Sequence, residues 1–200
     1  MSRRTGLPSM TRSLVVGGLL VAVTAITGTL VCQSAPSPVR LVGAVLRGDQ
    51  GARAVPDEGG LPNGVTVFAD EYPGVANLAP ELIAALRAAA ADAGIEFQVN
   101  SGWRSREYQN RLFRAAVAKY GSTERAARWV ATADTSAHVS GNAIDLGFEA
   151  AAWLSAHGAA YGLCQIYRNE PWHYELRPEA IEHGCPAMYA DPAHDQRMRR

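Results

Sequence analysis

Two stretches in the second half of the sequence decide the fold: SAHVSGNAID at 136–145 and EPWH at 170–173. Asp145 lies between Ile144 and Leu146, in an apolar run that is typical of a strand. A bare carboxylate is costly in such surroundings unless a metal ion or a strong donor neutralises it. The first stretch therefore predicts a loop that leads into a strand carrying a charge that needs a partner.

Two histidines accompany this carboxylate. His138 lies on the predicted loop, and His173 begins a further predicted strand. Two histidines and one carboxylate are a common ligand set for catalytic zinc, which keeps one position open for water. Glu170 is a second carboxylate that can act as general base on that water. Pro171 excludes a regular helix here, and positions three apart on a regular strand point to opposite faces. We therefore expect Glu170 on a turn that brings it back over the metal.

Each of these residues also has an ordinary structural interpretation. His138 alone fits a histidine on a surface loop, and His173 alone fits a hydrogen-bonded histidine in a strand. Asp145 alone fits the end of a strand, where backbone donors satisfy it. Spacing along the chain does not show that the residues meet in space, so a domain without metal stays open at this point.

A third polar cluster, SGWRS at 101–105, lies earlier in the chain. The guanidinium of Arg104 suits a carboxylate or an oxyanion, because its donors form a fixed fork. A surface ion pair with Glu107, one helical turn away, is the alternative.

Apolar periodicity and capping residues predict a mixed order of helices and strands. The pattern lacks a regular alternation of strand and helix, which favours the α+β class with a small, mainly antiparallel sheet packed with helices. Helices are expected over 80–93, 105–120, 122–129 and 149–157, and strands over 96–101, 142–148, 163–167 and 172–176.

The charge balance and the N-terminus bear on partners and location. Nineteen basic and 19 acidic residues cancel, which argues against nucleic-acid binding. Three arginines precede an uncharged run over 13–31, which indicates a signal peptide or signal anchor over 1–34. Lipidation of Cys32 is an alternative. We expect a flexible linker over 35–62, one domain over 63–190 and a polar tail over 191–200, outside the cytoplasm, with membrane contact if the first segment stays uncleaved.

The two remaining cysteines form a natural pair in an exported protein. Cys164 lies on a predicted strand and Cys185 in a Gly-Cys-Pro turn that follows it. An oxidising compartment favours a disulfide between them. Two reduced thiols, one of them buried, are the alternative.

The motifs together resemble the VanY-type zinc D-alanyl-D-alanine carboxypeptidases. That superfamily also includes the VanX dipeptidases, cell-wall endopeptidases and the zinc-bearing signalling domain of hedgehog proteins. The resemblance rests on SxHxxGxAxD at 136–145, on EPWH at 170–173 and on SGWRS at 101–105 with Gln109, where Trp103 stands for the tyrosine of the family. It covers roughly residues 64–176.

The resemblance implies a role for each matching residue. His138, Asp145 and His173 would bind one Zn²⁺ per chain. Glu170 would be the general base and then the acid to the leaving amine. Arg104 would stabilise the oxyanion or hold substrate carbonyl and carboxylate groups. Substrate contacts would come from Ser136 and Gln109.

These roles predict an exported zinc peptidase that removes the terminal D-alanine from peptidoglycan stem peptides. An L-Ala–D-Glu endopeptidase and a D,D-dipeptidase are alternatives within the same fold. A catalytically silent zinc domain that binds cell-wall peptides is an alternative of another class, although it would need neither Glu170 nor Arg104.

Overall fold

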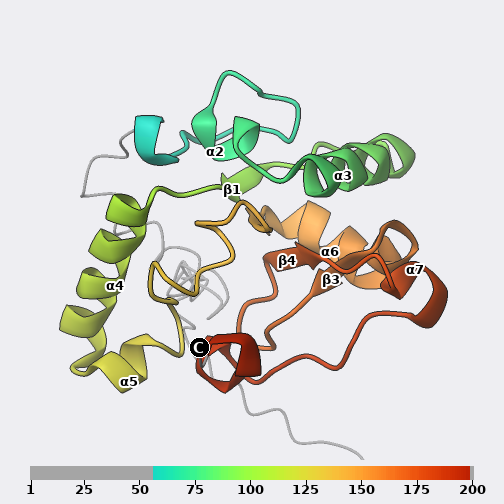
Figure 1. Ribbon diagram of the computed structural model, residues 1–200. Helices are drawn as coiled ribbons and strands as arrows, with labels where there is room; N and C mark the ends of the chain where they lie inside the picture. The colour runs from blue at the N-terminus through green and yellow to red at the C-terminus, as the bar shows by residue number, and fades with distance from the viewer. Residues whose placement is uncertain (1–55, 199–200) are drawn as a thin grey trace, which may run out of the picture. The chain divides into compact units, whose positions relative to one another are not determined.

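The centre of the domain is a small antiparallel sheet, seen in a computed structural model that describes residues 56–198 (Figure 1). Four strands follow one another in the order β1-β2-β4-β3. Together with the surrounding helices, this confirms the predicted α+β class. The strands are β1 (Val99–Ser101), β2 (Ala143–Leu146), β3 (Leu163–Gln165) and β4 (His173–Leu176).

The helices begin and end close to the predicted residues. The Ser105 side chain caps α4 by accepting a hydrogen bond from the Tyr108 N–H. Gly94 and Gly121 end α3 and α4 in the left-handed conformation that glycine tolerates best. The α-helices are α2 (Pro73–Ala76), α3 (Pro80–Ala93), α4 (Arg106–Tyr120), α5 (Thr123–Ala126), α6 (Phe148–His157) and α7 (Ala180–His183), with 3₁₀ turns η2 (Pro56–Glu58), η3 (Gly158–Tyr161), η4 (Pro192–His194) and η5 (Gln196–Met198).

One face of the sheet packs against helices to form the core. Ile144 of β2 pairs with Tyr174 of β4, and both side chains are fully buried. They join Leu82 and Leu86 of α3 and Leu154 of α6 in one apolar cluster. Figure 1 shows α4 and α5 at the opposite end of the domain from α3 and α6. The main apolar cluster therefore packs against one face of the sheet.

The opposite face of the same strands carries charged residues. Asp145 of β2 lies directly opposite His173 of β4 in the antiparallel register. Glu175 follows two positions later and lies opposite Cys164 of β3. Successive side chains of a strand alternate between faces, so these four residues share the face opposite the main apolar cluster. Cys164 also belongs to a second, smaller apolar cluster with Ile166, Tyr167 and Ala180. A slip of one residue would bury the charges in the core and expose Ile144 and Tyr174.

The ends of the described chain differ from the predicted linker and tail. Leu61, expected in the linker, is buried in the core cluster, and Glu58 forms an ion pair with Arg111 of α4. Asp191 and Asp195, expected in a polar tail, are buried. Both carboxylates meet arginine side chains, which is the physical reason that this polar segment packs. The predicted signal segment over 1–34, with Cys32, and the linker before residue 56 lie outside the described residues.

The helices of residues 56–198 include none with the length and apolar character that crossing a membrane requires.

Candidate metal centre

Three predicted ligands meet on the polar face of the sheet. His173 Nδ1 lies 3.1 Å from Asp145 Oδ1 and 3.2 Å from His138 Nε2. The third distance, from His138 Nε2 to Asp145 Oδ1, is 3.4 Å. Donor atoms bound to one tetrahedral zinc ion lie about 3.4 Å apart, since each stands about 2.1 Å from the metal. The three side chains are buried and already have the spacing and chemistry of a metal site.

The backbone orients His138 for this role. Its Nδ1–H donates to the carbonyl oxygen of Gly102 at 2.7 Å, which leaves the lone pair of Nε2 directed into the cluster. Burial, followed by the charge of Arg104, lowers the pKa of His138 and favours the neutral ring. A glycine at 102 lets this segment pack closely against Gly74, because a Cβ there would lie 2.0 Å from the carbonyl oxygen of Gly74.

His173 is held from behind by a carboxylate. Its Nε2 lies 3.4 Å from Glu175 Oε1, so Nε2–H donates outward and Nδ1 faces the cluster. Burial lowers the pKa of His173, but hydrogen bonds to Asp145 and Glu175 outweigh it and raise that pKa to about 10. Glu175 is almost fully buried and accepts hydrogen bonds from Arg177 and Arg197. A metal ion at the cluster would take the place of the proton on Nδ1.

Asp145 is shared between the histidines and Arg104. Its Oδ1 faces the histidines, while Oδ2 accepts a hydrogen bond from Arg104 Nη2 at 2.8 Å. Burial works against the charged form, but the nearby His138, then His173 and Arg104, hold the pKa of Asp145 well below its usual range. The carboxylate therefore stays ionised and offers one oxygen to a metal. Arg104 pairs here and not with Glu107, the surface partner considered from the sequence.

Glu170 lies beside the cluster on a turn, as predicted. The Glu170 N–H donates to the Tyr167 carbonyl, and the His173 N–H donates to the Glu170 carbonyl. This turn places Glu170 Oε2 3.9 Å from His173 Nδ1. Among the described residues Glu170 Oε1 has no hydrogen-bond partner, although the atom is buried. Burial raises the pKa of Glu170 to about 8.

The two residues expected at the substrate lie close to this cluster. Gln109 is buried, with its Oε1 accepting from Arg104 Nη1 and its Nε2 donating to the Ala131 carbonyl. Both ends of its amide are thus engaged within the protein, which places Gln109 behind Arg104. Ser136 is buried on the turn that leads to His138. Its contact with a substrate stays a prediction.

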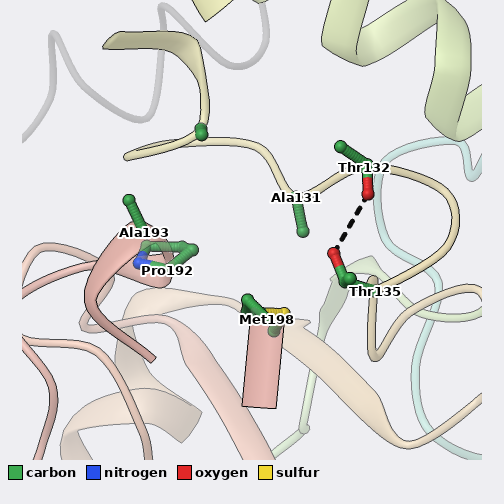
Figure 2. Close-up of a pocket in the computed structure, with 7 residues that line it drawn as sticks. Ala131, Thr132, Thr135, Pro192, Ala193 and Met198 are labelled. Atoms are coloured by element: carbon green, nitrogen blue, oxygen red, sulfur yellow. Dashed lines mark hydrogen bonds between the residues drawn. The ribbon is translucent and has the colours of Figure 1, made fainter. Parts of the chain in front are cut away.

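A cavity of about 190 Å³ lies between the chain after α5 and the C-terminal turns (Figure 2). Thr132 and Thr135 contribute hydroxyl groups that hydrogen-bond to each other at 3.1 Å. The remaining lining is apolar and includes Ala131, Pro192 and Met198. Ala131 also accepts the hydrogen bond from Gln109, so the cavity borders the residues that hold Arg104.

The predicted disulfide between Cys164 and Cys185 is present. It joins β3 to the chain that follows α7, across 21 residues of sequence. Cys164 is fully buried on the same face of the sheet as Glu175. The bond therefore ties the C-terminal part of the domain to the face that carries the cluster.

Sequence reasoning missed the residues behind His173. Glu175 was predicted only as part of a strand, although a charge at the second position after His173 falls on the same face. That alternation was the available signal. Arg197 and Asp195 carried no signal, because nothing in their local sequence shows which side chain they contact.

A buried His-Asp-His group beside a carboxylate with one unpaired oxygen, on one face of an antiparallel sheet, has the chemistry of a metal-dependent hydrolase site. Residues 75–179 match the family described as VanY, D-alanyl-D-alanine carboxypeptidase, and the chain belongs to this family. No functionally curated protein matches the sequence.

Several solved structures are similar to part of the chain. A point mutant of the VanY D,D-pentapeptidase from a VanB-type resistance cassette, in complex with Zn(II), is 30% identical over 52% of this chain and 72% of that one, with a TM-score of 0.44. The LdcB LD-carboxypeptidase is 24% identical over 52% and 61% of the two chains, with a TM-score of 0.45. DacB from Streptococcus pneumoniae is 31% identical over 52% and 67%, with a TM-score of 0.40.

Proposed function

We propose that this protein is an exported zinc peptidase that removes the terminal D-alanine from peptidoglycan stem peptides. The observation that carries the proposal is the triangle of His138 Nε2, Asp145 Oδ1 and His173 Nδ1, with sides of 3.1 to 3.4 Å. Membership of the VanY family supports the reaction and the substrate class.

His138, Asp145 and His173 would hold the zinc ion. Their two nitrogens and one oxygen match the borderline preference of zinc, and three protein ligands leave a position for water or substrate. Zinc in such a site supplies a Lewis acid that acidifies water and polarises the scissile carbonyl. The orphaned, buried oxygen of Glu170 next to this triangle also fits a site that works on water.

Glu170 moves the proton in this proposal. Its carboxylate takes a proton from the attacking water and passes it to the nitrogen of the leaving D-alanine. A pKa raised to about 8 by burial suits both halves of the transfer, because it lies near neutral pH. The turn before His173 provides the position, and the absence of a competing hydrogen bond among the described residues leaves Oε1 available.

Arg104 binds and orients the substrate in this proposal. Three of its five N–H donors contact Ser101, Gln109 and Asp145, which fixes the guanidinium plane. Two donors remain for the carboxylate of the substrate or for the oxyanion that forms during attack. The bond to Asp145 Oδ2 also restricts that carboxylate to one ligand oxygen.

The extracytoplasmic location completes the proposal. Its support is the arginine-flanked apolar run before residue 32, together with a disulfide of the kind that oxidising compartments maintain. Peptidoglycan stem peptides are accessible on that side of the membrane. An uncleaved first segment would keep the enzyme at the membrane surface.

The test is cleavage by the full-length protein, with zinc content measured on the same samples. The substrates are a pentapeptide that ends in D-Ala-D-Ala and a tetrapeptide that ends in a single D-alanine, with products identified by mass. Glu170→Gln is the informative variant, and Glu149→Gln, at an exposed glutamate near the start of α6, is its matched control.

We expect one zinc per chain, release of one D-alanine from the pentapeptide, and a loss of about 10²- to 10⁴-fold in Glu170→Gln only. Preference for the tetrapeptide would assign L,D-carboxypeptidase specificity instead. Cleavage at L-Ala–D-Glu, or release of a D,D-dipeptide, would keep the mechanism and change the bond. Bound zinc without turnover would indicate a binding module, and a chain without zinc would refute the proposal.

A further inference from the structure

The C-terminal segment, residues 185–198, is fastened to the face of the sheet that carries the cluster. It begins at the disulfide from Cys164 and continues with a hydrogen bond from the Tyr189 N–H to the Ile166 carbonyl. Arg128 then pairs with the buried Asp191 at 2.9 Å. This segment lies beyond residues 75–179, the part of the chain that matches the family. Its contacts therefore come from outside the part of the chain that matches the family.

Arg197 joins this segment to the carboxylate behind His173. Its Nη1 and Nη2 donate to the two oxygens of Glu175 at 2.8 and 3.3 Å. Its Nε donates to Asp195, which is fully buried and also accepts a hydrogen bond from the Tyr167 hydroxyl at 3.0 Å. The Tyr167 ring lies 5.1 Å from the His173 ring, centroid to centroid. These contacts form a closed ring around His173, which runs through Glu175, Arg197, Asp195 and Tyr167.

This ring of contacts can hold a metal ligand in the state that binds the metal. A carboxylate that accepts the second N–H of a ligating histidine sets its tautomer, fixes its ring and increases its basicity. Glu175 can do this only while it stays ionised and in place, which is costly for a carboxylate that is 1% exposed. Arg177 contacts only Oε2 of Glu175, whereas Arg197 contacts both oxygens. A contact to both oxygens fixes the plane of the carboxylate and also compensates its charge.

We propose that Arg197 is a positioning residue for His173, which it orients through Glu175, so that the C-terminal segment completes the metal site. The inference rests on the proposed function only in taking His173 as a zinc ligand. Arg197 itself touches neither substrate nor metal.

The experiment measures zinc affinity of the full-length protein by competition with a chromophoric chelator, together with the thermal midpoint of the metal-free form. Arg197→Met removes the contact to Glu175. Arg197→Lys keeps the positive charge but lacks the planar pair of donors that contacts both oxygens. Arg128→Met is the matched control, because it releases an arginine pair of the same segment without touching Glu175. We expect Arg197→Met to weaken zinc binding about 10- to 100-fold, with Arg197→Lys intermediate and Arg128→Met within about twofold of wild type.

A second pair of variants keeps the result interpretable if Arg197→Met folds poorly. Glu175→Gln removes the buried charge that Arg197 neutralises. In the Glu175→Gln background, Arg197→Met should cause no further loss of zinc affinity, because the charge through which Arg197 acts on His173 is already absent. Unchanged affinity in Arg197→Met, an equal loss in Arg128→Met, or a further loss when Arg197→Met is added to Glu175→Gln would each overturn the inference. A wild-type chain that binds no zinc would instead overturn the proposed function.

Discussion

Gly102 offers the sharpest test of how the backbone supports the metal site. In Gly102→Ala the new Cβ would lie 2.0 Å from the Gly74 carbonyl oxygen, whereas Cβ contacts essentially never fall below 3.0 Å. The two segments must therefore separate by about 1 Å, because a packed interior leaves no other room. That movement stretches the Trp103 N–H bond to Gly74, now 2.8 Å, and the His138 bond to Gly102, now 2.7 Å.

The expected cost follows from these two effects. Overpacking of a close contact costs about 1–3 kcal/mol, and a buried polar group that loses its partner costs a further 1–3 kcal/mol or so. We expect the free energy of unfolding of the metal-free protein to fall by about 2–6 kcal/mol. Zinc affinity should fall about 10-fold or more, because His138 loses the acceptor that orients it.

Urea unfolding of the metal-free protein and chelator competition measure the two quantities separately. The matched control is Gly147→Ala, where the Cβ would meet Gln98 at an ordinary 3.4 Å and where φ is −64°. The control should stay within about 1 kcal/mol of wild type, with unchanged zinc affinity. If Gly102→Ala matched this control in both measurements, the argument from close approach would be refuted.

Three other predictions address the disulfide, the pH dependence and the metal. Replacing Cys164 and Cys185 by alanine should lower the free energy of unfolding by about 3 kcal/mol, since the bond closes a loop of 21 residues; a loss below about 1 kcal/mol in urea would contradict this. Burial opposes the charged form of Asp191, but hydrogen bonds from His194 and Arg128 lower its pKa below the ordinary 3.8. The contribution of Asp191 to the free energy of unfolding is therefore present above that pH and is lost as the pH falls below it. The stability difference between wild type and Asp191→Asn should therefore be full at about pH 6 and shrink in acid, whereas a constant difference would exclude the charge as its source. Saturating zinc at about 100 times its dissociation constant should stabilise the wild type by about 2.7 kcal/mol, and a chelator should abolish that gain in a thermal scan. A zinc-induced shift that survives in a His173→Ala variant would place the metal elsewhere.

Much of the fold could be predicted because its signals are local. Pro80 and Gly94 mark the ends of α3, and Ser105 and Gly121 mark those of α4, through backbone preferences that a few neighbouring residues express. The apolar residues of α4 do not all fill its buried positions. Leu112 and Val117 are half-buried, while the buried positions of this helix are Gln109 and Ala116. A polar side chain is buried there because Arg104 and a backbone carbonyl satisfy it, which periodicity does not reveal.

The sequence by itself determined the candidate groups of the site: two histidines, two carboxylates and an arginine, each in a stretch whose residue types predict a loop, a turn or a strand. Only the tertiary structure decided which of them meet. The register that sets Asp145 opposite His173 depends on the packing of Ile144 and Tyr174 on the other face of the sheet. The contact between Arg197 and Glu175 joins positions 22 apart through a disulfide-anchored segment. Such contacts depend on how the whole chain closes around its core, because no local preference selects one distant partner over another.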